Sequence, residues 1–387
     1  MYPSIYYLVA DLFGIKLEFL KMIQTFGFFM AMSFLAASYV VSRELKRKEK
    51  EGLISSFTEQ RWRGKGVTFL DLAEAFIISF IVGYKLIYLA LNFHNFVNDA
   101  KGYLLSTQGN LLGGVIVGIG YTFFRYREKE KQKLDKPVLE TVTILPHMLV
   151  GNITLIAAGA GVLGAKIFDA LENYQEFIQH PVETIFSLSG LTVYGGLIFG
   201  AIAVLYYTKK KGIPTLHMVD AAAPSMMIAY AVGRIGCQMA GDGDWGIVNA
   251  APKPGWMGFL PNWMWSFSFP HNVVNEGIPI SGCMDAHCYA LNPPVFPTPF
   301  YETVMCTILF FILLSLRKKI HAPGVMFCVY LAMNGVERFL IELIRVNVKY
   351  HIFGIGITQA QLISPIFFLL GVFGMYYFHK KYARSLA

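Results

Sequence analysis

The sequence predicts an all-α membrane protein, a polytopic bundle of transmembrane helices. Hydrophobic residues make up 55% of its 387 residues and charged residues only 15%, whereas a soluble domain carries about 25% charged residues. Nine apolar stretches approach the length of about 20 residues that a helix needs to cross a bilayer. Basic clusters alternate with nearly uncharged loops between these stretches, a pattern typical of polytopic membrane proteins.

The expected spans follow the apolar stretches along the chain. They lie near residues 22–42, 68–92, 110–124, 140–172, 190–207, 216–240, 299–316, 323–343 and 359–378. The third and fifth stretches are short and rich in glycine, which favours tilted or broken helices. We therefore expect a single transmembrane domain over residues 1–378 with about nine spans.

The lysines and arginines orient this domain in the bilayer. Most of them fall in five clusters: SRELKRKEKE with RWRGK, RYREKEKQKLDK, TKKK, RKK and HKKYARS. Positive clusters face the cytoplasm, so the N-terminus is expected outside and residues 379–387 form a cytoplasmic tail. The formal net charge of +8 is thereby explained by orientation, and a nucleic-acid partner is not expected.

Residues 241–298 are the one long extramembrane segment, and the charge pattern puts them outside as a loop or lid. This segment carries Cys283 and Cys288 within GCMDAHC. An oxidising compartment would favour a disulfide between them, and two unpaired thiols are the alternative. A zinc site would need two further ligands, and only His287 is close in the sequence.

An internal repeat links two parts of the chain. Gly83-Tyr84-Lys85 resembles Gly164-Ala165-Lys166, and Gly113-Gly114 resembles Gly195-Gly196, at offsets of 81 and 82 residues. Each unit is predicted to form a helix that runs towards the outer face, a polar loop and a glycine-rich helix that runs back. We interpret residues 68–124 as an inserted duplicate of the helix pair at 140–207, with chance similarity between apolar helices as the alternative.

Charged residues within the expected spans mark candidate sites, because such groups are costly in a bilayer unless they face a cavity or a partner. Arg234 lies in AVGRIGCQMAGDGDWG, at the outer end of the sixth stretch, and Asp242 and Asp244 follow it. The alternative is that Arg234 extends only to the membrane interface.

A second cluster lies in NGVERFLIELIRVN. Arg338 and Glu342 are spaced i, i+4, and Glu342 and Arg345 are spaced i, i+3, so we expect all three on one helix face. Arginine matches a phosphate with a planar fork of donors. An ordinary interhelical salt bridge is the alternative.

Two further motifs carry polar groups at the expected outer face. FPTPFYETV places Tyr301 and Glu302 in the first turn of the seventh stretch, where a carboxylate also simply favours the helix dipole. In SLSGLTVYGGLIFG, Tyr194 precedes Gly195-Gly196, and a tyrosine there is often only an interface anchor. Together, arginines approaching one outer face predict a site for an anionic phospholipid.

These motifs resemble those of the prolipoprotein diacylglyceryl transferases. The matching segments are GRIGCQMAGDGDWG, FPTPFYE, RFLIELIR, VYGGLIFG and TQAQLIS, and the resemblance runs from about residue 160 to 378. It implies transfer of the diacylglyceryl group of phosphatidylglycerol to the lipobox cysteine thiol of a prolipoprotein signal peptide. A thioether would form, and glycerol phosphate would leave.

The resemblance also implies roles for individual residues. Arg234 and Arg338 would clamp the phosphate, Glu342 and Glu302 would hold these arginines, and Arg345 would act at the outer rim. Tyr194 is the first candidate for the general base and Glu302 the second. The remaining expected contacts to the substrate come from Tyr301, Asp242, Asp244, Gly195 and Gly196. No cofactor or metal is expected, because the histidines are scattered and no carboxylates cluster with metal-ligand spacing.

The chain departs from the family pattern in ways that mark a branch. Many members have His where Tyr194 stands, and tyrosine is a weak base at neutral pH unless its pKa is lowered. The family usually has seven spans, and the extra pair is explained by the repeat. Together with the cysteine-bearing loop, these departures resemble a Bacteroidetes-type branch. The enzyme is expected in the bacterial inner membrane, with its site towards the periplasm.

Two rival functions fit part of this pattern. Intramembrane arginines, broken helices and a repeat also occur in secondary transporters of anionic solutes. The clustering of the charged positions at the outer face, with none tracing a path inward, counts against that interpretation. A lipid-binding scaffold without catalysis is the other rival.

Overall fold

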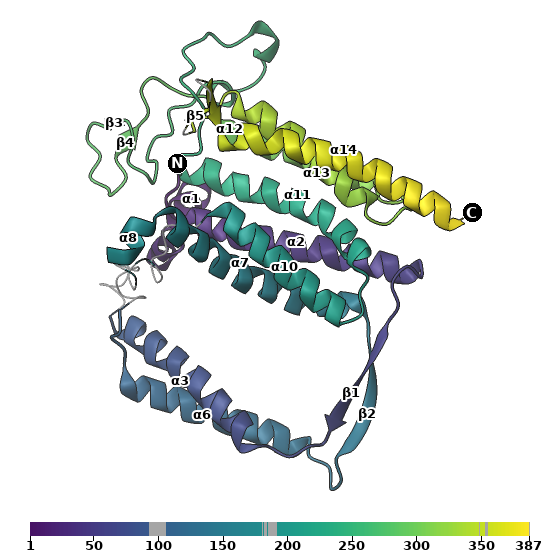
Figure 1. Ribbon diagram of the computed structural model, residues 1–387. Helices are drawn as coiled ribbons and strands as arrows, with labels where there is room; N and C mark the ends of the chain where they lie inside the picture. The colour runs from purple at the N-terminus through teal and green to yellow at the C-terminus, as the bar shows by residue number, and fades with distance from the viewer. Residues whose placement is uncertain are drawn as a thin grey trace. The chain divides into compact units, whose positions relative to one another are not determined.

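The computed structural model describes residues 1–92, 106–179, 181, 184, 192–347, 349–352 and 355–386. Helices dominate the described chain (Figure 1). The α-helices are α1 (Ile5–Phe13), α2 (Thr25–Lys50), α3 (Phe69–Leu91), α6 (Leu111–Lys131), α7 (Val150–Glu172), α8 (Tyr174–Gln179), α10 (Val193–Lys210), α11 (Thr215–Ala240), α12 (Thr298–Leu316), α13 (Val325–Glu342) and α14 (Gln359–Leu386). Short 3₁₀ helices are η1 (Glu18–Met22), η2 (Pro146–Leu149), η3 (Gly255–Met257) and η4 (Asn262–Met264).

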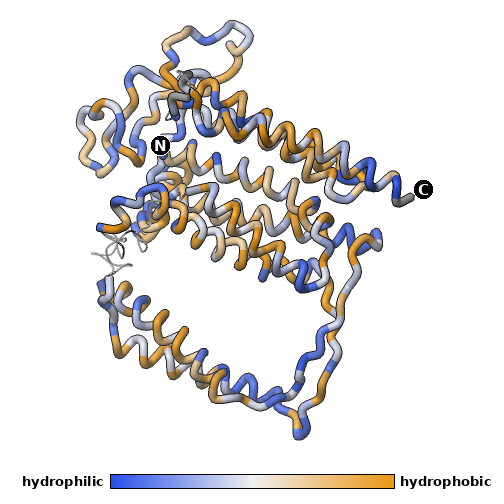
Figure 2. Tube along the Cα trace, in the orientation of Figure 1, coloured by the Kyte–Doolittle hydropathy of each residue, from blue (hydrophilic) through white to orange (hydrophobic). Residues whose placement is uncertain are grey.

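Each of the nine apolar stretches forms a helix over most of its length. Of the described helices, five are long and apolar enough to cross a membrane: Thr25–Lys50, Phe69–Leu91, Pro146–Glu172, Thr298–Leu316 and Gln359–Arg384. Figure 2 shows hydrophobic residues along these helices and hydrophilic ones towards the C-terminal end of α14. The protein is thus a helical membrane protein, and the count of nine spans stays a prediction.

Within the part of the chain that the structure describes, three small antiparallel sheets interrupt the expected all-α pattern. They pair β1 (Phe57–Arg63) with β2 (Val138–Ile144), β3 (Ile278–Pro279) with β4 (Tyr289–Ala290), and β5 (Lys349–Ile352) with β6 (Ile355–Thr358). The expectation of one helix across 140–172 is therefore wrong at its start, because β2 occupies its first residues. VLETVTI is rich in β-branched residues that favour a strand, and it pairs with FTEQRWR in the register Phe57↔Ile144.

Contacts group the chain into two compact units. The first contains Met1–Ser55, Pro146–Thr154 and Leu205–Ala387, and the second contains Ser56–Leu145 and Leu155–Val204. The expected tail at 379–387 continues α14 as helix as far as Leu386.

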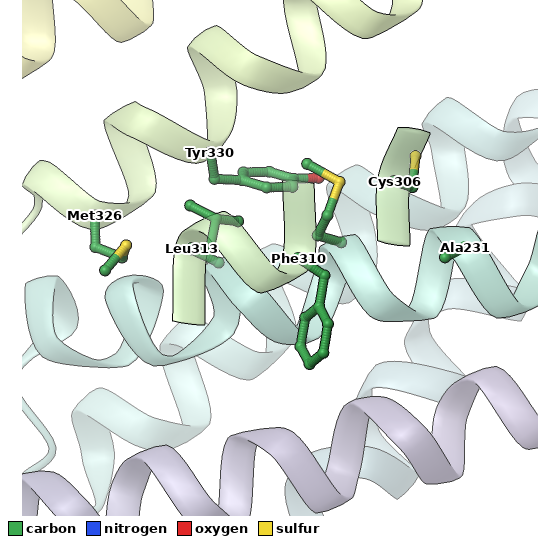
Figure 3. Close-up of a cluster of buried hydrophobic side chains, with 8 residues drawn as sticks. Ala231, Cys306, Phe310, Leu313, Met326 and Tyr330 are labelled. Atoms are coloured by element: carbon green, nitrogen blue, oxygen red, sulfur yellow. The ribbon is translucent and has the colours of Figure 1, made fainter. Parts of the chain in front are cut away.

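In the first unit, α11 packs against α2, α12 and α13, and α13 also packs against α12 and α14. The core between α11, α12 and α13 consists of apolar side chains (Figure 3). Small residues of α11, such as Ala223 and Ala231, are almost completely buried and allow the helices to approach closely. The core residues are Ala223, Met227, Ala231, Cys306, Phe310, Leu313, Met326 and Tyr330.

In the second unit, helices pair through glycine. α3 packs on α6, and a Cβ on Gly83 would lie 2.9 Å from the carbonyl oxygen of Gly113. In the same way, a Cβ on Gly164 of α7 would lie 2.5 Å from the carbonyl oxygen of Gly195 of α10. Both pairs of helices therefore need glycine for their close approach.

Candidate active site

Three helix ends meet at one end of the first unit. α11 ends at Ala240, α12 begins at Thr298 and α13 ends at Glu342, and these three helices contact one another. The segment after α11 joins the segment after α13 by a bridge between Gly246 and Arg345. A Cβ on Gly246 would lie 2.6 Å from the carbonyl oxygen of Ile344, so only glycine allows this approach.

Glu302 of α12 lies at the centre of this end and is fully buried. Its Oε2 lies 3.1 Å from Nε of Arg234. Its Oε1 lies 3.0 Å from Nη1 of Arg338 and 3.5 Å from Nη1 of Arg345. The hydroxyl of Tyr230 donates a hydrogen bond of 2.8 Å to the same Oε1. One carboxylate therefore orients a guanidinium group of α11, one of α13 and one of the segment directly after α13.

Asp244 is a second carboxylate that joins the arginines. One of its oxygens pairs with Arg234 and the other with Arg345. Burial alone would raise the pKa of Asp244, but the charges of Arg234 and Arg345 outweigh burial and hold that pKa below its ordinary value. Thr298 fixes this segment by donating its hydroxyl proton to the backbone oxygen of Asp244 over 2.7 Å. Asp244 is thus ionised and forms ion pairs with both Arg234 and Arg345.

The three arginines differ in how far solvent or a ligand reaches them. The side chain of Arg338 is 24% exposed, that of Arg234 13% and that of Arg345 6%. Nε of Arg345 is buried and has no hydrogen-bond partner among the described residues. Arg338 is therefore the guanidinium best placed to meet an anion, with Arg234 next.

Several predicted site residues adopt roles other than those expected. The interpretation of Arg338, Glu342 and Arg345 as one helix face is wrong, because α13 ends at Glu342 and Arg345 turns to Asp244 and Glu302. Glu342 lies 3.7 Å from Arg338 and accepts a hydrogen bond of 2.6 Å from Asn347.

Tyr301 and Asp242 do not bind the arginines through any hydrogen bond between described residues. The Tyr301 hydroxyl donates to the backbone oxygen of Met264 over 2.8 Å. Asp242 accepts a 3.4 Å hydrogen bond from the backbone N–H of Asp244. Burial, followed by the charge of Asp244, raises the pKa of Asp242, so its proton is held more tightly than in water.

Tyr194, Gly195 and Gly196 belong to the second unit, and Gly195 packs there against Phe168 and Gly164. Cys283 and Cys288 form a disulfide in the segment between α11 and α12.

Sequence reasoning missed Tyr230. Its ring lies under the guanidinium of Arg234, with 5.2 Å between the guanidinium carbon and the ring centroid, and its hydroxyl binds Glu302. The signal was available, because Tyr230 precedes Arg234 by four residues and therefore lies one turn away on the same helix face.

The structure places a second buried polar cluster at the opposite end of α11, so the expectation that charged positions gather only at the outer face is wrong. Asp220 accepts hydrogen bonds from the backbone N–H groups of Gly324 and Phe327, at 2.8 and 3.0 Å, and Glu44 pairs with Arg317. The two clusters are separated by about 21 Å along α11. The mainly apolar core of α11, α12 and α13, drawn in Figure 3, includes residues of α11 between Asp220 and Arg234.

The expectation that no carboxylates cluster with metal-ligand spacing is wrong. Among the described residues, ligand atoms of Cys237, Asp242 and Asp244 lie within 4.8 Å of one another. Both oxygens of Asp244 already pair with arginines, whose positive charges oppose a cation. The geometry therefore favours an anion at this end of the unit.

Comparison with known proteins places this site in a family. The family model described as prolipoprotein diacylglyceryl transferase matches residues 140–377, which include the whole arginine cluster. Relatives named phosphatidylglycerol–prolipoprotein diacylglyceryl transferase come from Clostridium botulinum (29% identical, covering 60% of this chain and 82% of the relative) and from Symbiobacterium thermophilum (29%, covering 62% and 81%). A relative of the same name from Enterococcus faecalis is 29% identical and covers 55% of this chain and 69% of its own. The matched region spans more than half of the chain, and the chain therefore belongs to the prolipoprotein diacylglyceryl transferase family.

Proposed function

We propose that this protein transfers the diacylglyceryl group of phosphatidylglycerol to the thiol of the lipobox cysteine of a prolipoprotein signal peptide. The reaction forms a thioether and releases glycerol phosphate, and it is the first step of lipoprotein lipidation. The observation that carries the proposal is the convergence of Arg234, Arg338 and Arg345 on Glu302 at one end of the helical unit. Membership of the family supports the same reaction.

The chemistry sets two demands on the site. The sulfur attacks the glycerol carbon, a C–S bond forms, and the C–O bond to phosphate breaks with its electron pair going to the leaving oxygen. Arg338, and behind it Arg234, stabilise the charge on the leaving phosphate as prepositioned donors. Glu302 and Asp244 keep the guanidinium groups aligned, so little reorganisation is needed when the substrate binds.

The thiol must also lose its proton, because the thiolate is the nucleophile. Glu302 is poorly suited to accept it, since both of its oxygens face arginines and it is fully buried. We retain Tyr194 as the candidate base on the family resemblance alone, since it stands where many members have histidine. Gly195 and Gly196 support Tyr194 by letting α10 approach α7.

The proposed setting is the bacterial inner membrane, with the N-terminus outside, the C-terminus in the cytoplasm and the arginine cluster towards the periplasm. The basic clusters support this orientation. The disulfide between Cys283 and Cys288 is consistent with residues 241–298 lying in an oxidising compartment.

A transporter of anionic solutes is the rival proposal. It needs a polar route between the two ends of the helical unit. The apolar core between α11, α12 and α13 disfavours such a route through these helices, and this observation supports the enzyme.

The decisive experiment mixes the purified protein with phosphatidylglycerol vesicles and a lipobox peptide and follows the mass of the peptide. We expect the wild type to add a diacylglyceryl group. Arg338→Ala should reduce the rate by about 100-fold or more, as expected for loss of a donor to a developing anion. Arg338→Lys should recover only part of the rate, because lysine keeps the charge and loses the planar fork.

Arg61→Ala is the matched control. The Arg61 side chain is 62% exposed and pairs with Glu59, far along the chain from the cluster, so the variant should match the wild type. A well-folded wild type without any mass gain, beside an active control enzyme, would reject the transferase proposal. Solute flux in vesicles would then test the transporter.

A further inference from the structure

A loop with a closed base extends from the segment between α11 and α12, and we call residues 249–266 the aromatic loop. The side-chain amide of Asn249 donates to the backbone oxygen of Trp265 over 2.7 Å, and the hydroxyl of Ser266 donates to that of Asn249 over 2.9 Å. The indole N–H of Trp265 also donates to the backbone oxygen of Ala251 over 2.9 Å. These contacts fix the two ends of the loop to each other.

The tip of the aromatic loop exposes its large aromatic side chains. Trp256 is 73% exposed and Phe259 82%, although the short helices η3 and η4 fold this part of the loop. Met257, which lies between them in the sequence, is buried instead, and the ammonium of Lys253 donates to the backbone oxygen of Leu260 over 2.6 Å. The folded tip therefore turns two aromatic rings outward, and exposed apolar surface of this kind marks contact with a partner or a membrane.

The base of the loop is attached to the first turn of α12. The ring of Trp263 packs on that of Phe300 with 4.9 Å between the ring centroids, and the Tyr301 hydroxyl donates to the backbone oxygen of Met264. Phe300 and Tyr301 are the third and fourth residues of α12, a helix long and apolar enough to cross a membrane. The base of the aromatic loop therefore lies at the level where α12 enters the bilayer, and the loop is at the top of Figure 1.

The composition of the loop matches a lipid surface. Residues 249–266 contain no Asp or Glu, and Lys253 is their only charged side chain. Tryptophan is enriched where membrane meets water, because its ring is apolar and its N–H is polar. A lysine beside it attracts anionic headgroups, and no carboxylate of the loop repels them. These residues therefore favour a bilayer that contains anionic lipid.

We propose that the tip of the aromatic loop inserts Trp256 and Phe259 into the headgroup region of the bilayer and anchors the segment between α11 and α12 to the membrane surface. On the orientation proposed above, this surface is the outer leaflet. Asp244, which pairs with two arginines of the site, precedes the loop by five residues. The anchor thus joins the arginine cluster to the lipid surface from which an anionic lipid comes. The inference goes beyond the proposed reaction and does not depend on it.

A fluorophore at the tip tests the insertion. Phe259→Cys provides an exposed thiol, whereas the free thiols Cys237, Cys306 and Cys328 are buried, so a thiol-reactive nitrobenzoxadiazole dye labels the tip selectively. The labelled full chain is placed in phosphatidylglycerol vesicles. We expect lipids with a spin label near the headgroup to quench the dye, and aqueous iodide to have little effect.

Two controls separate insertion from the affinity of the dye itself for lipid. Glu276 is exposed in the same segment but lies outside the aromatic loop, so a dye on Glu276→Cys should be quenched by iodide and not by the spin-labelled lipid. Trp256→Asp, combined with Phe259→Cys, places a charge in the tip, which is costly in a bilayer, and should move the dye from lipid quenching to iodide quenching. Trp256→Tyr keeps an interfacial aromatic side chain and should leave lipid quenching unchanged.

Three results would overturn the proposal. The first is equal iodide quenching of the dyes on Phe259→Cys and Glu276→Cys, which would place the tip in water. The second is unchanged lipid quenching in the Trp256→Asp variant. The third is a dye on Phe259→Cys that leaves water only after a lipobox peptide is added, because the tip would then bind the peptide. None of these measurements involves lipid transfer, so a protein that inserts its tip and transfers no lipid would support the anchor and reject the proposed reaction.

Discussion

The helix pairs α3–α6 and α7–α10 share one packing register and differ at one residue expected to do chemistry. Gly83 faces Gly113 as Gly164 faces Gly195. The agreement continues along the helices: Gly113 meets Ile87, four residues after Gly83, and Gly195 meets Phe168, four residues after Gly164. Chance similarity between apolar helices would not reproduce a register of contacts, so we propose that α3–α6 is a duplicate of α7–α10.

The polar contacts that begin the returning helices also correspond. The N–H of Asn110 donates to the carbonyl of Tyr84 over 2.8 Å, and that of Thr192 donates to the carbonyl of Ala165 over 3.4 Å. Lys85 donates to backbone oxygens that include that of Gln108, and Lys166 donates to that of Thr184. In both pairs, a lysine of the first helix therefore donates to a backbone oxygen of the segment between the helices.

The difference is Tyr194. The repeat offset of 82 residues places Leu112 at the equivalent position of α6, and Leu112 is 72% exposed. The family match begins at residue 140 and so leaves α3–α6 outside it. Glycines and a lysine make the same packing contacts in both helix pairs. The tyrosine hydroxyl of Tyr194 occurs only in α7–α10, the pair proposed to serve the reaction.

The largest expected effect comes from breaking the glycine contact in the pair that carries Tyr194. Gly164→Leu places side-chain atoms against the backbone of Gly195, and overpacking of this kind costs about 1–3 kcal/mol or more. We expect transferase activity to fall by about 100-fold or more, because the displaced α10 carries Tyr194, and a positioned proton-transfer group contributes about 10²–10⁴-fold. The matched variant Gly83→Leu should lower thermal stability but leave most of the activity. Equal losses in both variants would mean that the two pairs serve the reaction alike.

Removing the hydroxyl is the next test. Tyr194→Phe keeps the ring and should lower kcat by about 100-fold if the hydroxyl takes part in proton transfer. Tyr194→His should retain more activity than Tyr194→Phe, because the ordinary pKa of histidine lies near neutral and suits it to proton transfer. Leu112→Tyr is the reciprocal control and should leave the rate unchanged. A Phe variant as active as the wild type would remove Tyr194 from the list of candidate bases.

The lysines are expected to matter less. Lys166→Met removes a charge-assisted hydrogen bond to Thr184, a type of bond whose loss costs about 1.5–3 kcal/mol. Activity should fall by about tenfold, less than in Tyr194→Phe, because Lys166 acts on the proposed proton transfer only through the position of α10. Lys85→Met removes the corresponding contacts in α3–α6. It should change the rate by less than about twofold, because substitutions away from a site usually have small effects. Steady-state rates of the two variants, normalised to folded protein, decide between these outcomes.

Features that depend on residues close together in the sequence were predicted well, and contacts between residues far apart in the sequence were not. Apolar length predicted where helices form, because burial in lipid depends on local composition. The sequence placed Arg234, Arg338 and Arg345 at one face, and the structure brings them together. Their partners depended on where α13 ends: the helical spacing of Glu342 and Arg345 no longer applies beyond Glu342. The ribbon β1–β2 joins segments with about 80 residues between them, a pairing that no local pattern reveals.

The smallest expected effect follows from removing the duplicate altogether. β1 and β2 pair antiparallel up to Arg63 and Val138, so the chain enters and leaves α3–α6 at adjacent points of one ribbon. Replacing residues 64–137 by Asn-Gly, which favours a tight hairpin turn, should keep the ribbon closed and preserve activity within about threefold, since most changes outside a site are mild. Deleting α7–α10 and joining the flanking residues by a short glycine-rich linker should abolish activity. If excision of α3–α6 also abolished activity in a protein that remains folded, the duplicate would carry a function of its own.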